Sequence, residues 1–282
     1  MEKIRIISRL DIKGPNLVKG IHLEGLRVMG KPETFAKFYY ENGADELFFQ
    51  DTVASLYERN SLHEIISMTA RQIFIPLTVG GGLRTIEDIR DVLRAGADKV
   101  AINTAAIKNP QLIREAANRF GSSTIVVAIE AIRQPNGEYL AYTDNGREHT
   151  GIEVVQWAQK AEQLGAGEIV ITSVDKEGTG EGFDIELTSK VANAVTIPVI
   201  AHGGTGSPQH VEEVLKTAKA DAVAIASILH YDFISRQIEN SDNYQLEGNV
   251  SFLQSGKGYN KIKPCTLQDI KGYLKSVNLP IR

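Results

Sequence analysis

Two glycine-rich loops carry the most distinctive chemistry in this sequence. Gly80-Gly81-Gly82 and His202-Gly203-Gly204 each follow a short apolar run and precede an amphipathic segment. A glycine run between a strand and a helix lets backbone N–H groups approach an anion, and the helix N-terminus adds a favourable dipole. Asn103-Thr104 and Ala226-Ser227 follow the next apolar run in each case and add side-chain donors. We therefore predict two phosphate sites, one with Gly82, Asn103 and Thr104 and the other with Gly203, Gly204 and Ser227.

The two loops belong to a diverged internal repeat. Residues 75–82 match residues 197–204, and Ala97-Asp98 matches Ala220-Asp221 at nearly the same offset. Either glycine run alone is equally consistent with a simple tight turn, but the matched spacing favours phosphate binding. Two phosphate sites at one end of a molecule indicate an elongated bisphosphate ligand. The long period of the repeat argues against a solenoid.

Two carboxylates end apolar runs in positions suited to proton transfer. Asp11 lies in Leu10-Asp11-Ile12, and Glu130 lies in Ile129-Glu130-Ala131. If these runs are the first and fifth strands of an eight-stranded barrel, the carboxylates face each other between the phosphate sites, where a general acid and base are needed. An apolar floor raises a carboxyl pKa toward neutrality. The alternative is that they are solvated groups at the barrel rim or caps of strand ends. Asp51, at the end of the second strand, is a third carboxylate of this kind and could equally be structural.

The elements that must position these residues alternate short apolar runs with amphipathic segments. Eight runs fit strands that are buried on both faces: 5–11, 46–51, 75–79, 99–103, 125–130, 168–173, 199–201 and 222–226. Eight strands, each followed by a helix, predict an α/β fold, a parallel (β/α)₈ TIM barrel built from two half-barrel repeats. A doubly wound open sheet would normally use fewer strands and would not explain the repeat.

The whole chain, residues 1–282, reads as a single barrel with two interruptions. Residues 131–147 contain Pro135-Asn136-Gly137 and Asp144-Asn145-Gly146, which predict a hairpin inserted after the fifth strand. Residues 231–265 are polar and weakly periodic, and we interpret them as an insertion after the eighth strand. Loops that follow barrel strands lie on the catalytic face, so both insertions are expected there.

Four charged residues stand at strand starts, at the opposite end of the predicted barrel. They are Arg5, Glu46, Lys99 and Glu168, and their charges sum to zero. A ring of salt bridges that plugs the barrel bottom is the simpler interpretation. A gate that admits a small polar molecule from below is the alternative.

Composition sets the outer limits on function. The chain has 282 residues with a formal net charge of −4, so it lacks the polybasic surface typical of general nucleic-acid or anionic-membrane binding. The single cysteine, Cys265, excludes an internal disulfide and a cysteine zinc cluster, and the histidines lack metal-ligand spacing. No signal-peptide pattern or membrane-length apolar run is present. We expect a cytoplasmic protein without a metal or cofactor.

Taken together and in register, the motifs resemble those of the HisF family, the cyclase subunit of imidazole glycerol phosphate synthase. The resemblance runs from about residue 3 to 230 and rests on Leu10-Asp11-Ile12-Lys13, Val79-Gly80-Gly81-Gly82, Ala97-Asp98-Lys99-Val100, Ile102-Asn103-Thr104 and Gly203-Gly204. It implies a lyase of histidine biosynthesis that joins ammonia to a phosphoribulosyl aminoimidazole carboxamide bisphosphate. The ammonia comes from a separate glutaminase subunit at the N-terminal face and travels through the barrel.

The resemblance also implies roles for individual residues. Asp11 and Glu130 correspond to the catalytic pair, and Gly178 joins Gly203, Gly204 and Ser227 at the second phosphate site. Arg5, Glu46, Lys99 and Glu168 correspond to the ammonia gate. Asp98 corresponds to a glutaminase contact, and Lys19 lies in the mobile loop after the first strand.

This sequence departs from the family pattern at the catalytic face. Glu130 and Glu177 replace aspartates, Arg9 replaces a cysteine, and His202 replaces a small residue. A cation two residues from Asp11 lowers the pKa of that carboxyl and disfavours an acid role. The pattern therefore leaves an alternative function, a HisF-like subunit that channels ammonia for amidation of a sugar in surface-polysaccharide synthesis. A scaffold without activity is disfavoured, because so many functional positions match.

Overall fold

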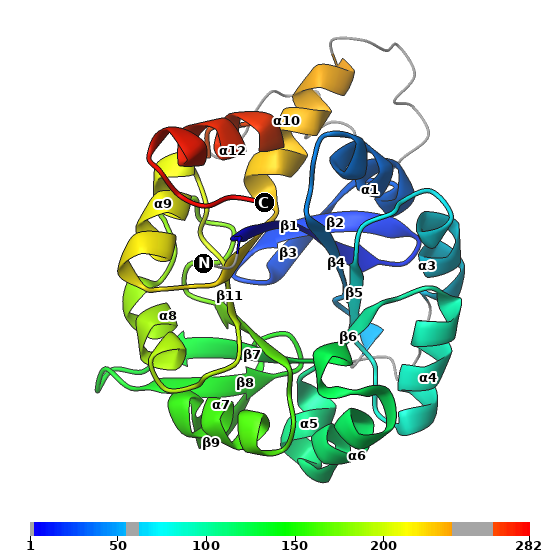
Figure 1. The fold of residues 1–282 in the computed structure, drawn as a ribbon, viewed down its shortest axis with the longest axis vertical. Helices are drawn as coiled ribbons and strands as arrows, with labels where there is room; N and C mark the ends of the chain where they lie inside the picture. Colours follow the sequence, from blue (N-terminus) through cyan, green and yellow to red (C-terminus); the bar gives the residue numbers. More distant parts are fainter. Residues whose placement is uncertain (1–2, 55–61, 239–261) are drawn as a thin grey trace.

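The eight parallel strands close into a barrel, as the sequence predicts. The computed structural model describes residues 3–54, 62–238 and 262–282. The barrel strands are β1 (Arg5–Lys13), β4 (Glu46–Asp51), β5 (Leu77–Gly80), β6 (Lys99–Ile102), β7 (Ile125–Arg133), β10 (Glu168–Ser173), β11 (Val199–His202) and β12 (Ala222–Ile225). Parallel pairing runs through all eight, and β1 closes the ring on β12. The (β/α)₈ TIM barrel is confirmed (Figure 1).

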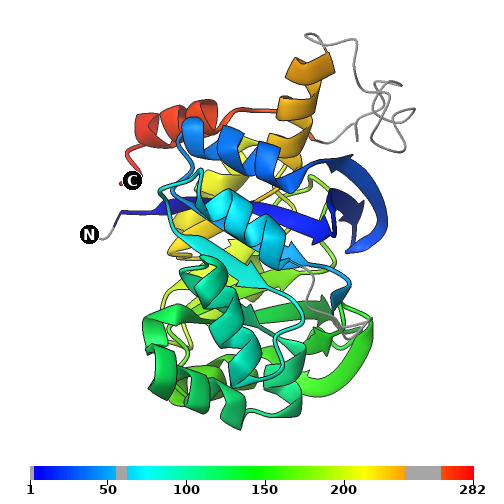
Figure 2. The same cartoon turned by 90° about the vertical axis from the view of Figure 1, so that its right-hand side faces the viewer.

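Helices surround the strands on the outside (Figures 1 and 2). They are α1 (Pro32–Glu41), α3 (His63–Ala70), α4 (Ile86–Ala95), α5 (Thr104–Lys108), α6 (Gln111–Phe120), the 3₁₀ turn η1 (Ser122–Thr124), α7 (Val154–Gln163), α8 (Ile185–Ala192), α9 (Pro208–Thr217), α10 (Ser227–Ile238) and α12 (Leu267–Ser276). Thr85 and Thr266 begin α4 and α12 with reciprocal capping boxes, in which an aspartate three residues later completes the pair. Pro208 occupies the first turn of α9.

Apolar side chains fill two separate compartments, because successive strand residues point to opposite faces of the sheet. The larger compartment lies between the strands and the helices and includes Leu10, Phe49 and Trp157. The smaller lies inside the barrel and comprises Ile7, Phe48, Ala101, Val126, Val170, Ile200, Ala222 and Ala224. The barrel interior is therefore packed with side chains in the half nearer the amino ends of the strands.

The internal repeat is visible in the hydrogen bonds. The backbone N–H of Leu77 donates to Asp98 Oδ2 at 2.8 Å, and that of Val199 donates to Asp221 Oδ2 at 2.8 Å. Gly81 and Gly203 both adopt a φ of +100°. A Cβ at Gly81 would collide with the carbonyl oxygen of Asp51, and a Cβ at Gly203 would lie 2.8 Å from that of Ser173. The glycines are thus required by turns that let neighbouring strand ends approach closely.

Two antiparallel extensions rise from the barrel mouth. The hairpin β2 (Asn16–Ile21) and β3 (Glu24–Gly30) follows β1 and was not predicted from the sequence. The second extension begins in β7, the fifth barrel strand, which continues beyond the barrel to Arg133. There it pairs with β8 (Tyr139–Thr143), which in turn pairs with β9 (Glu148–Glu153). The predicted hairpin of residues 131–147 falls within this extension.

The segment predicted as an insertion after the eighth strand is described only in part. Residues 231–238 continue helix α10, and α12 begins at Leu267. The middle of the segment, residues 239–261, lies outside the described residues. In the part of the chain that the structure describes, no helix combines the length and apolarity needed to cross a membrane.

Candidate active site

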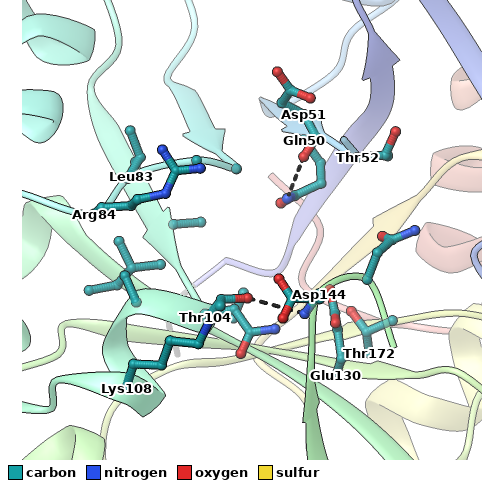
Figure 3. A pocket seen from close by; sticks show the side chains of 18 of the residues that line it. Gln50, Asp51, Thr52, Leu83, Arg84, Thr104, Lys108, Glu130, Asp144 and Thr172 are labelled. Atoms are coloured by element: carbon teal, nitrogen blue, oxygen red, sulfur yellow. Dashed lines mark hydrogen bonds between the residues drawn. The ribbon is translucent and has the colours of Figure 1, made fainter. Parts of the chain in front are cut away.

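A cavity of about 310 Å³ opens at the carboxyl ends of the barrel strands (Figure 3). It brings together Gly82, Asn103, Thr104 and Glu130, which the sequence assigned to one phosphate site and to the acid–base pair. Thr104 Oγ1 accepts a hydrogen bond from the backbone of Asp144 at 3.1 Å. Asn103 Nδ2 donates to the carbonyl of Tyr142 at 3.2 Å, whereas its buried Oδ1 has no partner among the described residues.

Two cations at this cavity were missed by the sequence analysis. Arg84 and Lys108 line it on the side of Thr104 (Figure 3). Arg84 Nη2 donates to the carbonyl of Ala54 at 2.7 Å, which orients the guanidinium. A signal was present, because Arg84 lies two residues after Gly82 and Lys108 ends the helix that follows Asn103. With the glycine turn, these cations make this end of the cavity suited to an anion.

The second predicted phosphate site is assembled but closed. Gly178, Gly203, Gly204 and Ser227 line one small cavity together with Lys19 and His202. Its volume is about 10 Å³, which is near the minimum for a single water molecule. A phosphate therefore requires the surrounding groups to move apart.

Glu130 lies in the cavity with an environment that favours its protonated form. Its Oε2 accepts a hydrogen bond from the backbone N–H of Gly146 at 2.8 Å. Burial raises the pKa of this carboxyl to about 7, against the opposing effects of that hydrogen bond and of the Arg9 charge. Glu130 can therefore hold or release a proton near neutrality, as a general acid must.

Asp11 is held in the opposite state. It is 2% exposed, and its two oxygens accept from Arg9 Nε at 2.9 Å and from Lys19 Nζ at 3.3 Å. Burial alone would raise the pKa of Asp11, but Arg9 and Lys19 outweigh it and hold the pKa far below its usual range. Arg9 and Glu130 line the cavity and Asp11 does not. The two carboxyls therefore differ in environment: Asp11 is paired with Arg9, whereas Glu130 lines the cavity together with Arg9.

Lys19 fastens the β2–β3 hairpin over the barrel mouth. Its ammonium forms ion pairs with Glu177 and with Asp11, and all three side chains are buried. Glu177 also accepts backbone hydrogen bonds from the hairpin, through Oε2 from Leu23 and through its carbonyl from His22, both at 2.9 Å. Burial opposes charge on Lys19, but the Glu177 and Asp11 carboxylates raise its pKa, so it stays a cation.

His202 packs against the far end of the Arg9 guanidinium. Its Nδ1 lies 3.2 Å from Arg9 Nη1 and 3.1 Å from Thr172 Oγ1. Burial, reinforced by the Arg9 charge, lowers the pKa of His202 far below its usual range. The ring is therefore neutral and able to accept a hydrogen bond from Arg9.

The four charges at the opposite end of the barrel are in contact. Arg5 pairs with Glu46 at 2.8 Å and Glu168 at 3.0 Å, and Lys99 pairs with the same two carboxylates at 3.3 and 3.0 Å. Each side chain is largely buried. The structure thus forms a closed ionic ring, which both sequence interpretations require.

Asp98 has a structural contact that the sequence analysis did not foresee. Its side chain accepts from the backbone of Leu77, and Asp221 makes the equivalent bond in the other half-barrel. The hydrogen bond to Leu77 fixes the first residue of β5, so Asp98 has a structural role in the barrel itself. No cluster of three His, Cys, Asp or Glu side chains within residues 3–54, 62–238 and 262–282 is arranged to hold a metal ion.

Comparison with known proteins adds independent information. A family model described as "Histidine biosynthesis protein" matches residues 5–235. Several curated relatives carry the name "Imidazole glycerol phosphate synthase subunit HisF". The Legionella pneumophila protein is 61% identical over 206 residues, covering 73% of this chain and 97% of the relative. The Lactococcus lactis protein is 51% identical (80% of this chain, 88% of the relative) and the Methanopyrus kandleri protein 49% (80% and 90%).

Proposed function

The chain belongs to the HisF family of histidine biosynthesis proteins, and on this basis we propose that it is the cyclase subunit of an imidazole glycerol phosphate synthase. The enzyme uses ammonia to convert a phosphoribulosyl aminoimidazole carboxamide bisphosphate into imidazole glycerol phosphate. The observation that carries the proposal is the cavity itself, where a phosphate cradle and a carboxyl with a pKa of about 7 lie together.

One phosphate of the substrate binds at Gly82, Asn103 and Thr104, where Arg84 and Lys108 supply positive charge. The other binds at Gly178, Gly203, Gly204 and Ser227. The second cavity is closed by the hairpin that carries Lys19, so substrate binding requires the Lys19–Glu177 contact to open. Glu130 then lies between the two phosphate sites, at the reacting part of the substrate.

The chemistry assigns different tasks to the two carboxyls. When ammonia adds to the ketone of the ribulosyl group and an imine forms, the carbonyl oxygen leaves as water and needs a proton. Glu130 supplies that proton, because it is protonated near neutrality. Asp11 stays ionised between Arg9 and Lys19 and stabilises positive charge at the mouth.

The nitrogen source is a glutaminase subunit, because HisF subunits act with a HisH glutaminase in the synthase complex. We place this partner at the N-terminal face of the barrel, where Asp98 and the ionic ring lie. The ring of Arg5, Glu46, Lys99 and Glu168 is then the gate through which ammonia enters.

Turnover of the bisphosphate with excess ammonium salt at alkaline pH, without any glutaminase, tests the cyclase proposal. Product formation at a rate that saturates with the bisphosphate supports it. A flat trace from a protein with an intact melting transition contradicts it.

One observation favours a second candidate, an ammonia-channelling subunit for amidation of a sugar in surface-polysaccharide synthesis. Arg9 neutralises Asp11 at the mouth, while the ionic ring at the opposite end is complete. Such a protein needs the route for ammonia but not the cyclase chemistry. The flat trace described above, combined with ammonia transfer from the glutaminase to a sugar-modifying enzyme, is the result expected of it.

A further inference from the structure

Two layers separate the ionic ring from the cavity inside the barrel. Along β1, the residues that face the barrel interior are, in order, Arg5 in the ionic ring, Ile7 in the apolar cluster that fills the smaller compartment inside the barrel, and Arg9 at the cavity. β4 follows the same order, with Glu46, Phe48 and Gln50. A small molecule that enters through the ring therefore crosses the apolar cluster and then meets the layer that contains Arg9.

The Arg9 guanidinium covers part of this cluster by packing over the ring of Phe48. Its guanidinium carbon lies 5.4 Å from the centroid of the Phe48 ring, a cation–π contact. From β1 the side chain reaches past the neighbouring β12, with Nη1 3.2 Å from His202 on β11 and 3.5 Å from Thr172 on β10. It is 4% exposed, so these contacts fix its position.

The other side of the same layer is built from small residues. Ala101 belongs to the apolar cluster and also lines the cavity, and Ala128 packs against the cluster and lines the cavity beside Glu130. The interior and the cavity are thus contiguous on the Ala101–Ala128 side, and the Arg9 cation lines the same cavity.

We propose that Arg9 is a cationic barrier at the exit of the barrel interior, which passes neutral ammonia toward Glu130 and rejects the ammonium ion. The proposal rests on the proposed passage of ammonia through the barrel. It adds a selective step at the upper end of that route, at a residue where the family pattern has cysteine.

The physical reason is the fixed charge of a guanidinium in a site with little water. Arginine remains protonated at all relevant pH values. Its counter-ion Asp11 does not line the cavity, and the neighbouring His202 is neutral. The apolar cluster below cannot solvate a second cation. The carboxyls of Asp51, Glu130 and Asp144 line the cavity and do not belong to the cluster.

A thiol placed at the exit tests cation rejection without relying on turnover. We would introduce Ala128→Cys in a Cys265→Ser background and measure its rates of modification by methyl methanethiosulfonate, which is neutral, and by its 2-aminoethyl analogue, which is a cation. Because both reagents attack the same thiolate, the ratio of the two rates cancels any change in the thiol pKa. Ala101→Cys is the second placement if the first variant does not fold.

We expect the cationic-to-neutral rate ratio to rise about tenfold when Arg9→Met removes the charge at similar side-chain length. Arg9→Lys, which keeps the charge, should leave the ratio near that of the parent. An unchanged ratio in Arg9→Met, or an equal rise in both variants, would overturn the proposal. Arg9→Gln serves as a second neutral variant if Arg9→Met unfolds.

Ammonium-driven turnover separates this proposal from the proposed function. At pH 7 we expect the KM for total ammonium to fall about tenfold in Arg9→Met, because ammonium that then enters the cavity can lose its proton to the ionised form of Glu130 and react as ammonia. In Arg9→Lys, which keeps the charge, the KM should stay within twofold of the parent value. If the parent protein shows no turnover, the cyclase proposal fails, while the labelling ratio still decides whether Arg9 rejects cations. If the parent turns over and the labelling ratio ignores the Arg9 charge, the Arg9 proposal fails alone.

Discussion

Asp11 and Glu130 show how neighbours decide the chemistry of one functional group. Both lie at the mouth of the same barrel, where Asp11 is buried and Glu130 is partly buried. Asp11 accepts from two cations and its pKa is held far below the usual range, whereas Glu130 accepts from one backbone amide and its pKa is about 7. The sequence indicated the first result, because Arg9 lies two residues from Asp11. It did not show that Lys19, eight residues away, completes the ion cluster.

We predict that Glu130→Gln lowers kcat by a factor of about 10² to 10⁴, because it removes the proton donor. In the parent protein, the rate per neutral ammonia should fall as pH rises through about 7, since burial raises the pKa of Glu130 to about 7 and the acid form is lost above it. A pH–rate series with ammonium salt measures both effects.

The matched control is Glu138→Gln, an exposed carboxyl on the same antiparallel extension. It should keep both the rate and the pH profile of the parent. A Glu130→Gln variant with a parental kcat would remove this residue from the mechanism.

We predict that Asp11→Asn costs about 3–5 kcal/mol of folding free energy, because it leaves Arg9 and Lys19 buried without their shared counter-charge. The pKa of Asp11 is lowered in the folded state, so this stabilisation is present at neutral pH. It is lost as pH falls below the ordinary value of 3.8. Urea unfolding at several pH values gives the measurement.

An exposed ion pair provides the comparison for Asp11. Glu186 contacts Lys190 at 2.8 Å with both side chains nearly half exposed, so Glu186→Gln should shift the urea midpoint very little. Equal midpoints for Asp11→Asn and the parent would show that the buried cluster is not stabilising.

The β2–β3 hairpin is the element that connects the fold to substrate entry. It covers the second phosphate site and is fastened through Lys19 and Glu177. The sequence did not predict it as a hairpin, because β3 is half exposed and glycines interrupt the alternation that identifies a strand. The buried apolar barrel strands and the capped helices, by contrast, carry strong local signals.

We predict that Lys19→Met loosens this hairpin, because methionine keeps the length of the side chain and removes both ion pairs. Amide hydrogen exchange in β2 and β3 should accelerate at least about tenfold, while exchange in β4 stays as in the parent. Mass-spectrometric exchange on the whole chain reports each segment separately.

Lys13→Met is the suitable control, since Lys13 ends β1 as an exposed residue. If exchange in β2 and β3 were the same in Lys19→Met and Lys13→Met, the ion pairs would have no role in holding the hairpin closed.

At the scale of the whole molecule, the sequence predicted the barrel and its duplication. The repeat explained why two glycine turns and two aspartate–backbone bonds recur, and the strand positions placed four charges on one ring. Side-chain geometry was not predictable in the same way. The sequence alone does not specify the direction in which each side chain points inside a closed barrel. For this reason it did not predict that Arg84 and Lys108 line the cavity, or that Arg9 packs over Phe48.

We predict that Lys99→Met lowers the ratio of glutamine-driven to ammonium-driven turnover about tenfold, because it leaves Glu46 and Glu168 with Arg5 alone and disrupts the gate. The exposed Lys190→Met should leave that ratio unchanged. A parental ratio in Lys99→Met would favour the simpler view that the ring is a salt-bridge plug.

The pairing of β1 with β12 also has a consequence for synthesis on the ribosome. Arg5 pairs with Ala222 and Ser8 with Ile225, so the first strand to emerge lacks one neighbour until almost the whole barrel has been translated. Contacts this distant in sequence form slowly, because a long loop must close first. The strand that bears Arg9 and Asp11 therefore keeps one edge unpaired until β12 has been made, and an unpaired strand edge of this kind favours aggregation of the partly folded chain.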